Sequence, residues 1–175
     1  SWSGYLYQGK VALYHVLCLL ENREECNGYK LQLDLLEDFA ILNAQSTPVS
    51  LHQVKAKKTQ YYSGYQADVT KVKKKASDNN CDNAYFHSAR EITDKTATEI
   101  ASEESPVKLY EYNGQFHCEV DEIDNKIEAQ LKKLWQGQSF KETDDYARIA
   151  RQHFDQLILK QVLFIHGIIH TGSQS

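Results

Sequence analysis

The sequence predicts an α/β fold in which helices pack on both faces of a sheet. Apolar residues recur at helical spacing over residues 5–20, and leucines alternate with polar residues over residues 29–35. Further segments follow in the order strand, strand, helix, strand. A chain that mixes these two periods buries its apolar faces when helices cover a sheet.

The remaining elements of the sheet region follow from short local patterns. Residues 38–42 and 49–56 are short apolar segments that predict the second and third strands. A helix is expected over residues 59–75, where four apolar side chains lie along one side. A fourth strand is expected over residues 84–91, followed by a polar helix near residues 93–102.

The C-terminal part predicts a hairpin and two helices. Asn113-Gly114 interrupts an alternating pattern over residues 107–120, and Asn-Gly favours the positive φ angles of a type I′ turn. Helices are expected over residues 122–135 and 142–170. The second of them is apolar on nearly every side and must therefore be buried. We expect it to form an interface with another copy of the chain or with a missing C-terminal region.

The composition is that of an ordinary globular domain. The chain has 175 residues, of which 41% are hydrophobic, and a net charge of −4. This length suits one domain with a small helical appendage. The start lacks the pattern of a signal peptide, and the longest apolar stretch is too short for a membrane span. The four cysteines form no CxxC pair, which favours reduced thiols in the cytoplasm. The absence of Met predicts a segment of a longer protein.

Charge is unevenly distributed along the chain. Residues 50–76 contain a single acid, Asp68, whereas residues 91–130 contain eleven acids and three lysines. The first window holds seven lysines: Lys55, Lys57, Lys58, Lys71, Lys73, Lys74 and Lys75. A locally basic face can attract phosphates on an acidic protein, because salt screening confines the field to roughly 10 Å. A solvated lysine-rich helix is the alternative interpretation.

An acid at the head of one predicted strand is followed by Gln-x-Lys on the next. Asp38 opens its strand, and Gln53 and Lys55 share one face because they lie two residues apart. If the two strands are antiparallel neighbours, all three side chains converge at one end of the sheet. Carboxylate and amide oxygens bind Mg²⁺, and an adjacent lysine can assist phosphodiester hydrolysis. The spacing therefore predicts a metal-dependent nuclease site.

These residues also have structural interpretations. Asp38 could terminate a turn, and Gln53 and Lys55 could lie on the solvent face of an edge strand, where lysine discourages aggregation. His52 alternates with Gln53 along the predicted strand, so it faces the core and is expected to be structural.

Three segments resemble the N-terminal nuclease domain of bacterial anti-phage effectors, including CBASS-type effectors: GYLYQGKVALYHVL, LQLDLLEDFAIL and LHQVKAKK. Two more, AYFHSAREI and VKLYEYNGQFHCEVDEIDNKI, resemble effectors of the ABC three-component type. The chain is similar, more distantly, to Mrr-type restriction endonucleases. The resemblance implies a restriction-endonuclease-like PD-(D/E)xK fold, with a mixed sheet flanked by helices. It implies a nuclease core over residues 1–120 and a helical extension over residues 121–175.

The resemblance also implies roles for individual residues. Asp38 ligates the metal, Gln53 takes the place of the Glu or Gln in the (E/Q)xK element, and Lys55 is the catalytic lysine. Gln8 stands on the first helix where many relatives have a metal-binding Glu, and a Gln there is a weaker ligand.

Two acids flank this implied site. Neither Asp34 nor Glu37 is expected to be a direct ligand, although Asp34 could contribute if its strand face is the right one. The lysines expected to hold the nucleic-acid backbone are Lys57, Lys58, Lys71, Lys73, Lys74 and Lys75.

The implied activity is endonucleolytic cleavage of DNA with Mg²⁺ or Mn²⁺, in defence against phage. Because one active site cuts one strand, duplex cleavage would require a homo-oligomer or a larger defence complex. The alternative is a degraded nuclease fold that binds nucleic acid or a partner protein, since Gln8 and Gln53 stand at nominally acidic positions.

Overall fold

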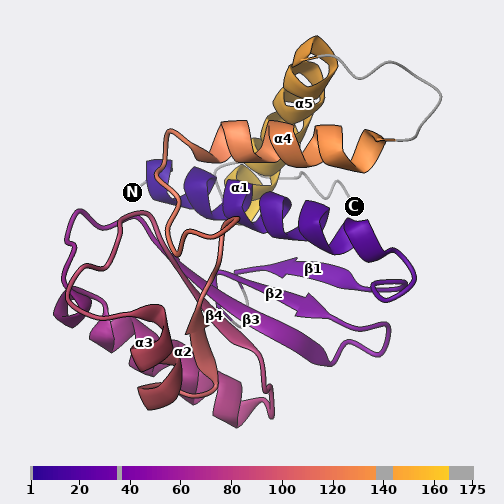
Figure 1. Ribbon diagram of the computed structural model, residues 1–175. Helices are drawn as coiled ribbons and strands as arrows, with labels where there is room; N and C mark the ends of the chain where they lie inside the picture. The colour runs from indigo at the N-terminus through magenta and orange to yellow at the C-terminus, as the bar shows by residue number, and fades with distance from the viewer. Residues whose placement is uncertain (1, 35–36, 137–143, 166–175) are drawn as a thin grey trace. The chain divides into compact units, whose positions relative to one another are not determined.

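The computed structural model describes residues 2–34, 37–136 and 144–165, which form two compact units (Figure 1). One unit contains the described residues within Ser1–Glu21 and Ile123–Ser175, and the other is Asn22–Glu122. The first is helical and the second is built on a sheet.

Five strands form one mixed sheet in the order β1-β2-β3-β4-β5. They are β1 (Lys30–Leu33), β2 (Phe39–Leu42), β3 (Pro48–Lys55), β4 (Ala84–Ser88) and β5 (Val107–Leu109). The first three strands are antiparallel neighbours, whereas β3, β4 and β5 run parallel. The predicted α/β class and the four predicted strands over residues 29–91 are confirmed.

Two helices pack against the sheet within this unit. Helix α2 (Gln66–Asp78) contacts β3, β4 and β5, and α3 (Ala97–Glu103) contacts β5 (Figure 1). Val69 and Val72 of α2 join a buried apolar cluster with residues of the sheet and with Ile100 of α3. Helix α2 begins later than predicted, because a short 3₁₀ turn precedes it.

The two faces of β3 have different environments. Leu51 belongs to the apolar cluster that contains the buried side of α2. Gln53 and Lys55 share the face of Leu51, because side chains alternate along a strand. His52 and Val54 lie on the opposite face and are fully or almost fully buried. The strand therefore separates the Gln-x-Lys pair from a buried histidine.

The hairpin expected over residues 107–120 does not form as predicted. Val107–Leu109 pairs parallel with β4, and its apolar side chains complete the core beneath α2. The Asn113-Gly114 turn is present, with positive φ at both residues. It closes only a single antiparallel bridge, between Tyr112 and Gln115. The hairpin prediction was wrong because the apolar residues that suggested it, Val107–Leu109, pair with the distant strand β4 instead.

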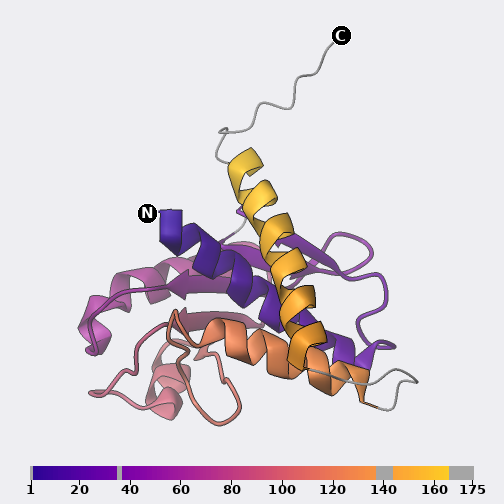
Figure 2. The ribbon, with the colours of Figure 1, turned by 90° about the horizontal axis from the view of Figure 1, so that it is seen from above.

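The helical unit consists of α1 (Trp2–Leu19), α4 (Ile123–Trp135) and α5 (Asp144–Ile165), which contact one another pairwise (Figure 2). A Cβ on Gly9 of α1 would lie 2.4 Å from Cγ2 of Ile158 on α5. Close approach of these two helices therefore requires a glycine at this position. The described part of α5 agrees with its predicted start, and residues 166–170 of the expected helix lie outside the described residues.

Ion pairs join the helices of this unit at one partly buried position. Arg151 of α5 lies 2.7 Å from Glu128 and 3.3 Å from Asp124, both on α4. Lys10 of α1 reaches the same Asp124 at 2.8 Å. These contacts explain why α1 belongs to one compact unit with α4 and α5. The chain crosses between the units after Glu21 and again after Glu122. The division into a nuclease core over residues 1–120 and an extension over residues 121–175 stays a prediction.

All four cysteines are free thiols. Within the described ranges, no helix is both long enough and apolar enough to cross a membrane.

Candidate active site

The predicted meeting of Asp38 with the Gln-x-Lys strand is present. Asp38 precedes β2 directly, and Phe39 of β2 pairs with His52 of the antiparallel β3. The Oδ2 atom of Asp38 accepts a hydrogen bond of 2.6 Å from the backbone N–H of Val54. The same oxygen accepts a hydrogen bond from Nε2 of Gln53. Antiparallel pairing thus fixes a carboxylate against the end of β3.

Gln53 is buried but incompletely hydrogen bonded. Its side chain is 1% exposed, and its Oε1 atom has no hydrogen-bond partner within the described part of the chain. A buried carbonyl oxygen without a partner costs about 1–3 kcal/mol. A cation beside Asp38 would offset that cost, because Mg²⁺ and Mn²⁺ prefer carboxylate and amide oxygens. The donor set therefore fits a divalent cation.

Burial is the main influence on the Asp38 carboxyl. It raises the pKa of Asp38 above its ordinary value, and this effect exceeds the opposing influences. The opposing influences are the Val54 backbone hydrogen bond, the charge of Lys55, the Gln53 hydrogen bond and the charge of Lys71. A bound cation would favour the ionised form of this carboxylate.

Glu37, which was expected to flank the site without being a direct ligand, is buried next to Asp38. Its side chain is 8% exposed, and Oε1 has no hydrogen-bond partner among the described residues. Burial raises the pKa of Glu37, the charge of Asp38 raises it further, and the charges of Lys71, Lys75 and Lys55 oppose the rise. Asp34, the other flanking acid, is exposed and has a positive φ of 53°.

Lys55 ends β3 with a half-buried side chain. Its Nζ atom lies 3.5 Å from Oδ1 of Asp68 on α2, and 27% of the side chain is exposed. Asp68 also pairs with Lys57 at 2.6 Å. The charge of Lys55 lowers the pKa of both Asp38 and Glu37, so the ammonium group lies within electrostatic range of both carboxyls.

The lysines of α2 have different neighbours. Lys71 and Lys75, one helical turn apart, face the carboxyls of the site closely enough to lower the pKa of Glu37. By contrast, Lys73 pairs with Glu104 at 3.4 Å and Lys74 pairs with Asp78 at 2.6 Å. Lys58, in the loop after β3, is exposed. The basic window is therefore only partly directed at the site.

Gln8 lies on α1 in the helical unit and is half-buried. Its part in a metal site stays a prediction.

A buried polar chain occupies the opposite face of the sheet. Nε2 of His52 lies 2.8 Å from Oγ of Ser50, and its Nδ1 lies 2.9 Å from Nε2 of His87. Nδ1 of His87 lies 2.7 Å from the hydroxyl of Tyr112. Both histidines are fully buried. The expectation that His52 faces the core is confirmed, and the residues that surround it were not anticipated. The described residues contain no cluster of three or more His, Cys, Asp or Glu side chains able to hold a metal.

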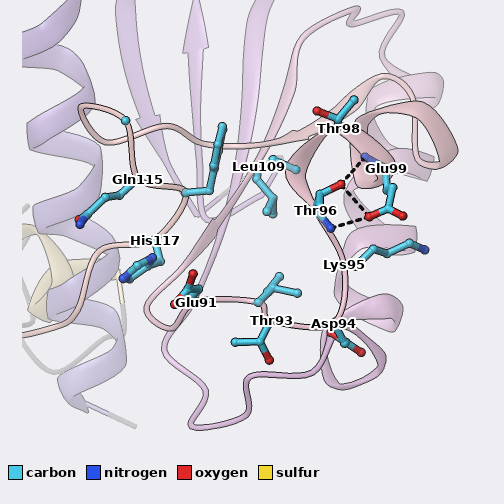
Figure 3. Close-up of a pocket in the computed structure, with 14 residues that line it drawn as sticks. Glu91, Thr93, Asp94, Lys95, Thr96, Thr98, Glu99, Leu109, Gln115 and His117 are labelled. Carbon is cyan, nitrogen blue, oxygen red and sulfur yellow. Dashed lines mark hydrogen bonds between the residues drawn. The ribbon is translucent and has the colours of Figure 1, made fainter.

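A cavity of about 760 Å³ lies elsewhere in the sheet unit (Figure 3). Its walls are residues 91–99, Leu109 of β5 and residues 114–117, which include His117. None of the predicted site residues lines it. No local motif in the sequence indicated this cavity, because its walls combine residues 91–99 with Leu109 and residues 114–117 only once the chain is folded.

Comparisons with protein families agree with this geometry. Residues 1–93 match the family model described as Cap4, dsDNA endonuclease domain. Residues 107–174 match C-terminal domain 1 of the ABC-three component (ABC-3C) systems. No individual curated protein matches the chain significantly.

The mixed sheet, its flanking helices and the first of these matches define a restriction-endonuclease-like nuclease fold. The chain belongs to the Cap4 dsDNA endonuclease domain family, whose model covers more than half of it. It is a DNA endonuclease of an anti-phage defence system, and a nuclease domain of this class uses a divalent metal ion.

Proposed function

We propose that Asp38 and Gln53 bind a Mg²⁺ ion, for which Mn²⁺ can substitute, and that Lys55 is the catalytic lysine. The meeting of Asp38 with the end of β3, beside the unpartnered Oε1 of Gln53, is the observation that supports this assignment. Gln8 is a further candidate ligand on α1. The alternative interpretation of Gln53 and Lys55 as an exposed edge has no support, since β3 lies between β2 and β4.

The residues of the site have separate tasks in phosphodiester hydrolysis. The Val54 N–H and the Gln53 amide hold the Asp38 carboxylate in one orientation. The ammonium group of Lys55 stabilises negative charge that develops on the phosphoryl oxygens and orients the attacking water. A bound divalent ion polarises the phosphate and lowers the pKa of a water molecule. Burial of Gln53 limits competing solvent at the carboxylate.

DNA binding is assigned to the basic residues around this site. Lys71 and Lys75 are the strongest candidates, because their charges act on the carboxyls beside which the scissile phosphate must lie. Lys57, Lys58, Lys73 and Lys74 would add contacts farther along the backbone. Lys57, Lys73 and Lys74 already have acidic partners, so each new phosphate contact would replace an ion pair.

The helical part supplies the surface for assembly. Tyr146, Ile149, Leu157 and Leu159 of α5 are apolar and exposed. We assign residues 121–175 to a helical extension that joins a second copy of the chain or another component of the defence system. Pairing would supply two active sites, one for each DNA strand. The free thiols are compatible with a cytoplasmic site of action.

Cleavage of supercoiled plasmid DNA tests the assignment. The native chain is expected to cut with Mg²⁺ or Mn²⁺, and EDTA is expected to abolish cutting. Lys55→Ala should be inactive, whereas Lys108→Ala is the control and should cut like the native chain, because Lys108 is an exposed lysine of β5 outside the proposed site. Cutting that persists in Lys55→Ala would contradict the assigned site. Salt-sensitive DNA binding without cutting by the native chain would favour the binding-module alternative.

A further inference from the structure

Glu37 has an environment that a structural role does not explain. It is the residue before Asp38, and its side chain is 8% exposed. One carboxylate oxygen, Oε1, is buried without a hydrogen-bond partner in the described part of the chain. Burial of an ionised carboxylate without compensation is unfavourable, so most buried acids are paired or bind metals.

The positive charges around Glu37 do not satisfy it. Lys55, Lys71 and Lys75 lie within electrostatic range. In the described residues, however, Glu37 forms no ion pair of 4 Å or less, while Lys55 pairs with Asp68. Glu37 therefore keeps a buried acceptor, Oε1, that none of these lysines satisfies.

Without Glu37, the proposed metal site contains a single negative charge. Asp38 supplies one carboxylate and Gln53 supplies a neutral amide oxygen. Protein sites for Mg²⁺ use one or two carboxylates, with waters and phosphate oxygens completing the octahedron. A second carboxylate would raise the attraction for a dication at a site that its three lysines otherwise weaken.

We propose that Glu37 is a direct ligand of the divalent cation, on the same ion as Asp38 and Gln53. This inference rests on the proposed function, since it assigns one more ligand to that site. The three oxygen donors then come from two neighbouring parts of the sheet. Glu37 and Asp38 supply carboxylates directly before β2, and Gln53 supplies an amide oxygen from β3. The unpartnered oxygens of Glu37 and Gln53 are the atoms that the cation satisfies.

Mn²⁺ binding by the full chain, measured by isothermal titration calorimetry without DNA, tests the proposal. Glu37→Gln keeps the shape of the side chain and removes its charge. The Kd of this variant for Mn²⁺ is expected to rise at least roughly tenfold. Loss of a residue that only supports a metal ligand already lowers metal affinity by about that factor, so loss of a direct ligand should cost no less. Asp34→Asn is the matched control, because Asp34 is a neighbouring acid that is exposed, and its Kd should equal that of the native chain.

A thermal unfolding series gives an independent readout. Without metal, Glu37→Gln should melt at a higher temperature than the native chain, because it removes a buried charge without a partner. The rise in Tm caused by Mn²⁺ should be smaller in the variant, since stabilisation by a ligand follows its affinity. A merely structural Glu37 would give the opposite result without metal, a lower Tm.

The possible results separate this inference from the proposed function. Native Mn²⁺ affinity in Glu37→Gln, together with lost affinity in Asp38→Asn, overturns the role of Glu37 and leaves the metal site intact. No Mn²⁺ binding by the native chain, or unchanged binding in Asp38→Asn, overturns both. Weakened binding in Glu37→Gln and in Asp38→Asn, but not in Asp34→Asn, supports both.

Discussion

The two faces of β3 carry polar side chains of opposite character. On one face, His52 is hydrogen bonded to Ser50 and His87, and His87 continues the chain to Tyr112. The rings of Phe39 and His52 stack with centroids 4.2 Å apart. On the other face, Gln53 is equally buried but leaves its amide oxygen without a described partner.

We interpret this difference as one between polar groups that stabilise the fold and polar groups that bind the proposed cation. A buried polar network is favourable when its members are satisfied, and a partly satisfied one is costly. The histidine face has its hydrogen bonds without any ligand. In the proposed site, the face of Gln53 reaches its favourable state when a cation binds beside Asp38. Four predictions test this separation, from the largest expected effect to the smallest.

Removal of the Lys55 ammonium group should have the largest effect, and it should fall on catalysis. Lys55→Ala is expected to lower the rate of DNA cleavage roughly 10²- to 10³-fold, because electrostatic stabilisation of the transition state is removed. Its unfolding midpoint should change little, since Lys57 remains paired with Asp68. Single-turnover cleavage and urea unfolding measure the two quantities. A large decrease in the free energy of unfolding would instead show that Lys55 stabilises the fold.

Breaking the histidine face should instead affect stability. His87→Phe retains an aromatic ring against Tyr110 but removes one hydrogen bond from His52 and one from Tyr112. The free energy of unfolding should fall by about 2–4 kcal/mol. Urea unfolding measures it, and metal-dependent cleavage by the folded fraction should persist. Absence of cleavage at native stability would show that this face takes part in the reaction.

The lysines of α2 should differ in their effect on DNA binding. Replacing Lys71 and Lys75 together by Gln should reduce the salt dependence of DNA binding. The slope of the logarithm of the binding constant against the logarithm of salt concentration should become shallower by roughly 0.9 for each phosphate that a lysine no longer neutralises. Lys108→Gln is the control, because Lys108 is an exposed lysine of β5 to which no DNA contact is assigned. Fluorescence anisotropy at several salt concentrations gives the slopes. Equal slopes for all variants would place the DNA elsewhere.

The smallest effect concerns the pH dependence of stability without metal. Because the pKa of Glu37 is raised on folding, the folded state holds its proton more tightly, and the native chain loses stability as pH rises through the raised pKa. Glu37→Gln lacks this decrease. Its advantage in unfolding free energy should be absent below the ordinary pKa of 4.5 and should reach the order of 1 kcal/mol near neutral pH. Denaturant unfolding at several pH values measures it, and an advantage independent of pH would show that Glu37 is not a buried charge without a partner.

Much of the candidate site could be predicted from strand order and side-chain alternation. Asp38 at the head of one strand and Gln53 two residues before Lys55 on the next imply convergence once the strands are antiparallel neighbours. That pairing is local, because a short loop joins the two strands. The burial of His52 followed from the same alternation.

Other features depended on contacts that no local pattern encodes. Glu37 lies outside the regular part of β2, so alternation does not determine where its side chain points. Its burial depends on neighbours from elsewhere in the fold. The pairing of Lys73 with Glu104 is non-local, as is the parallel pairing of β5 with β4. The Asn113-Gly114 turn was correctly located, yet a turn alone does not decide which strand the preceding residues join.

Anomalous X-ray scattering from crystals of the native chain soaked in Mn²⁺ tests the proposed metal site most directly. We predict one strong peak within bonding distance, roughly 2.0–2.6 Å, of oxygens from both Asp38 and Gln53, as for hard cations with oxygen ligands. The same protein preparation should first be shown to cleave DNA. If the Mn²⁺ peak then lies elsewhere and this site is empty, the result would contradict the assignment of Asp38 and Gln53 as metal ligands.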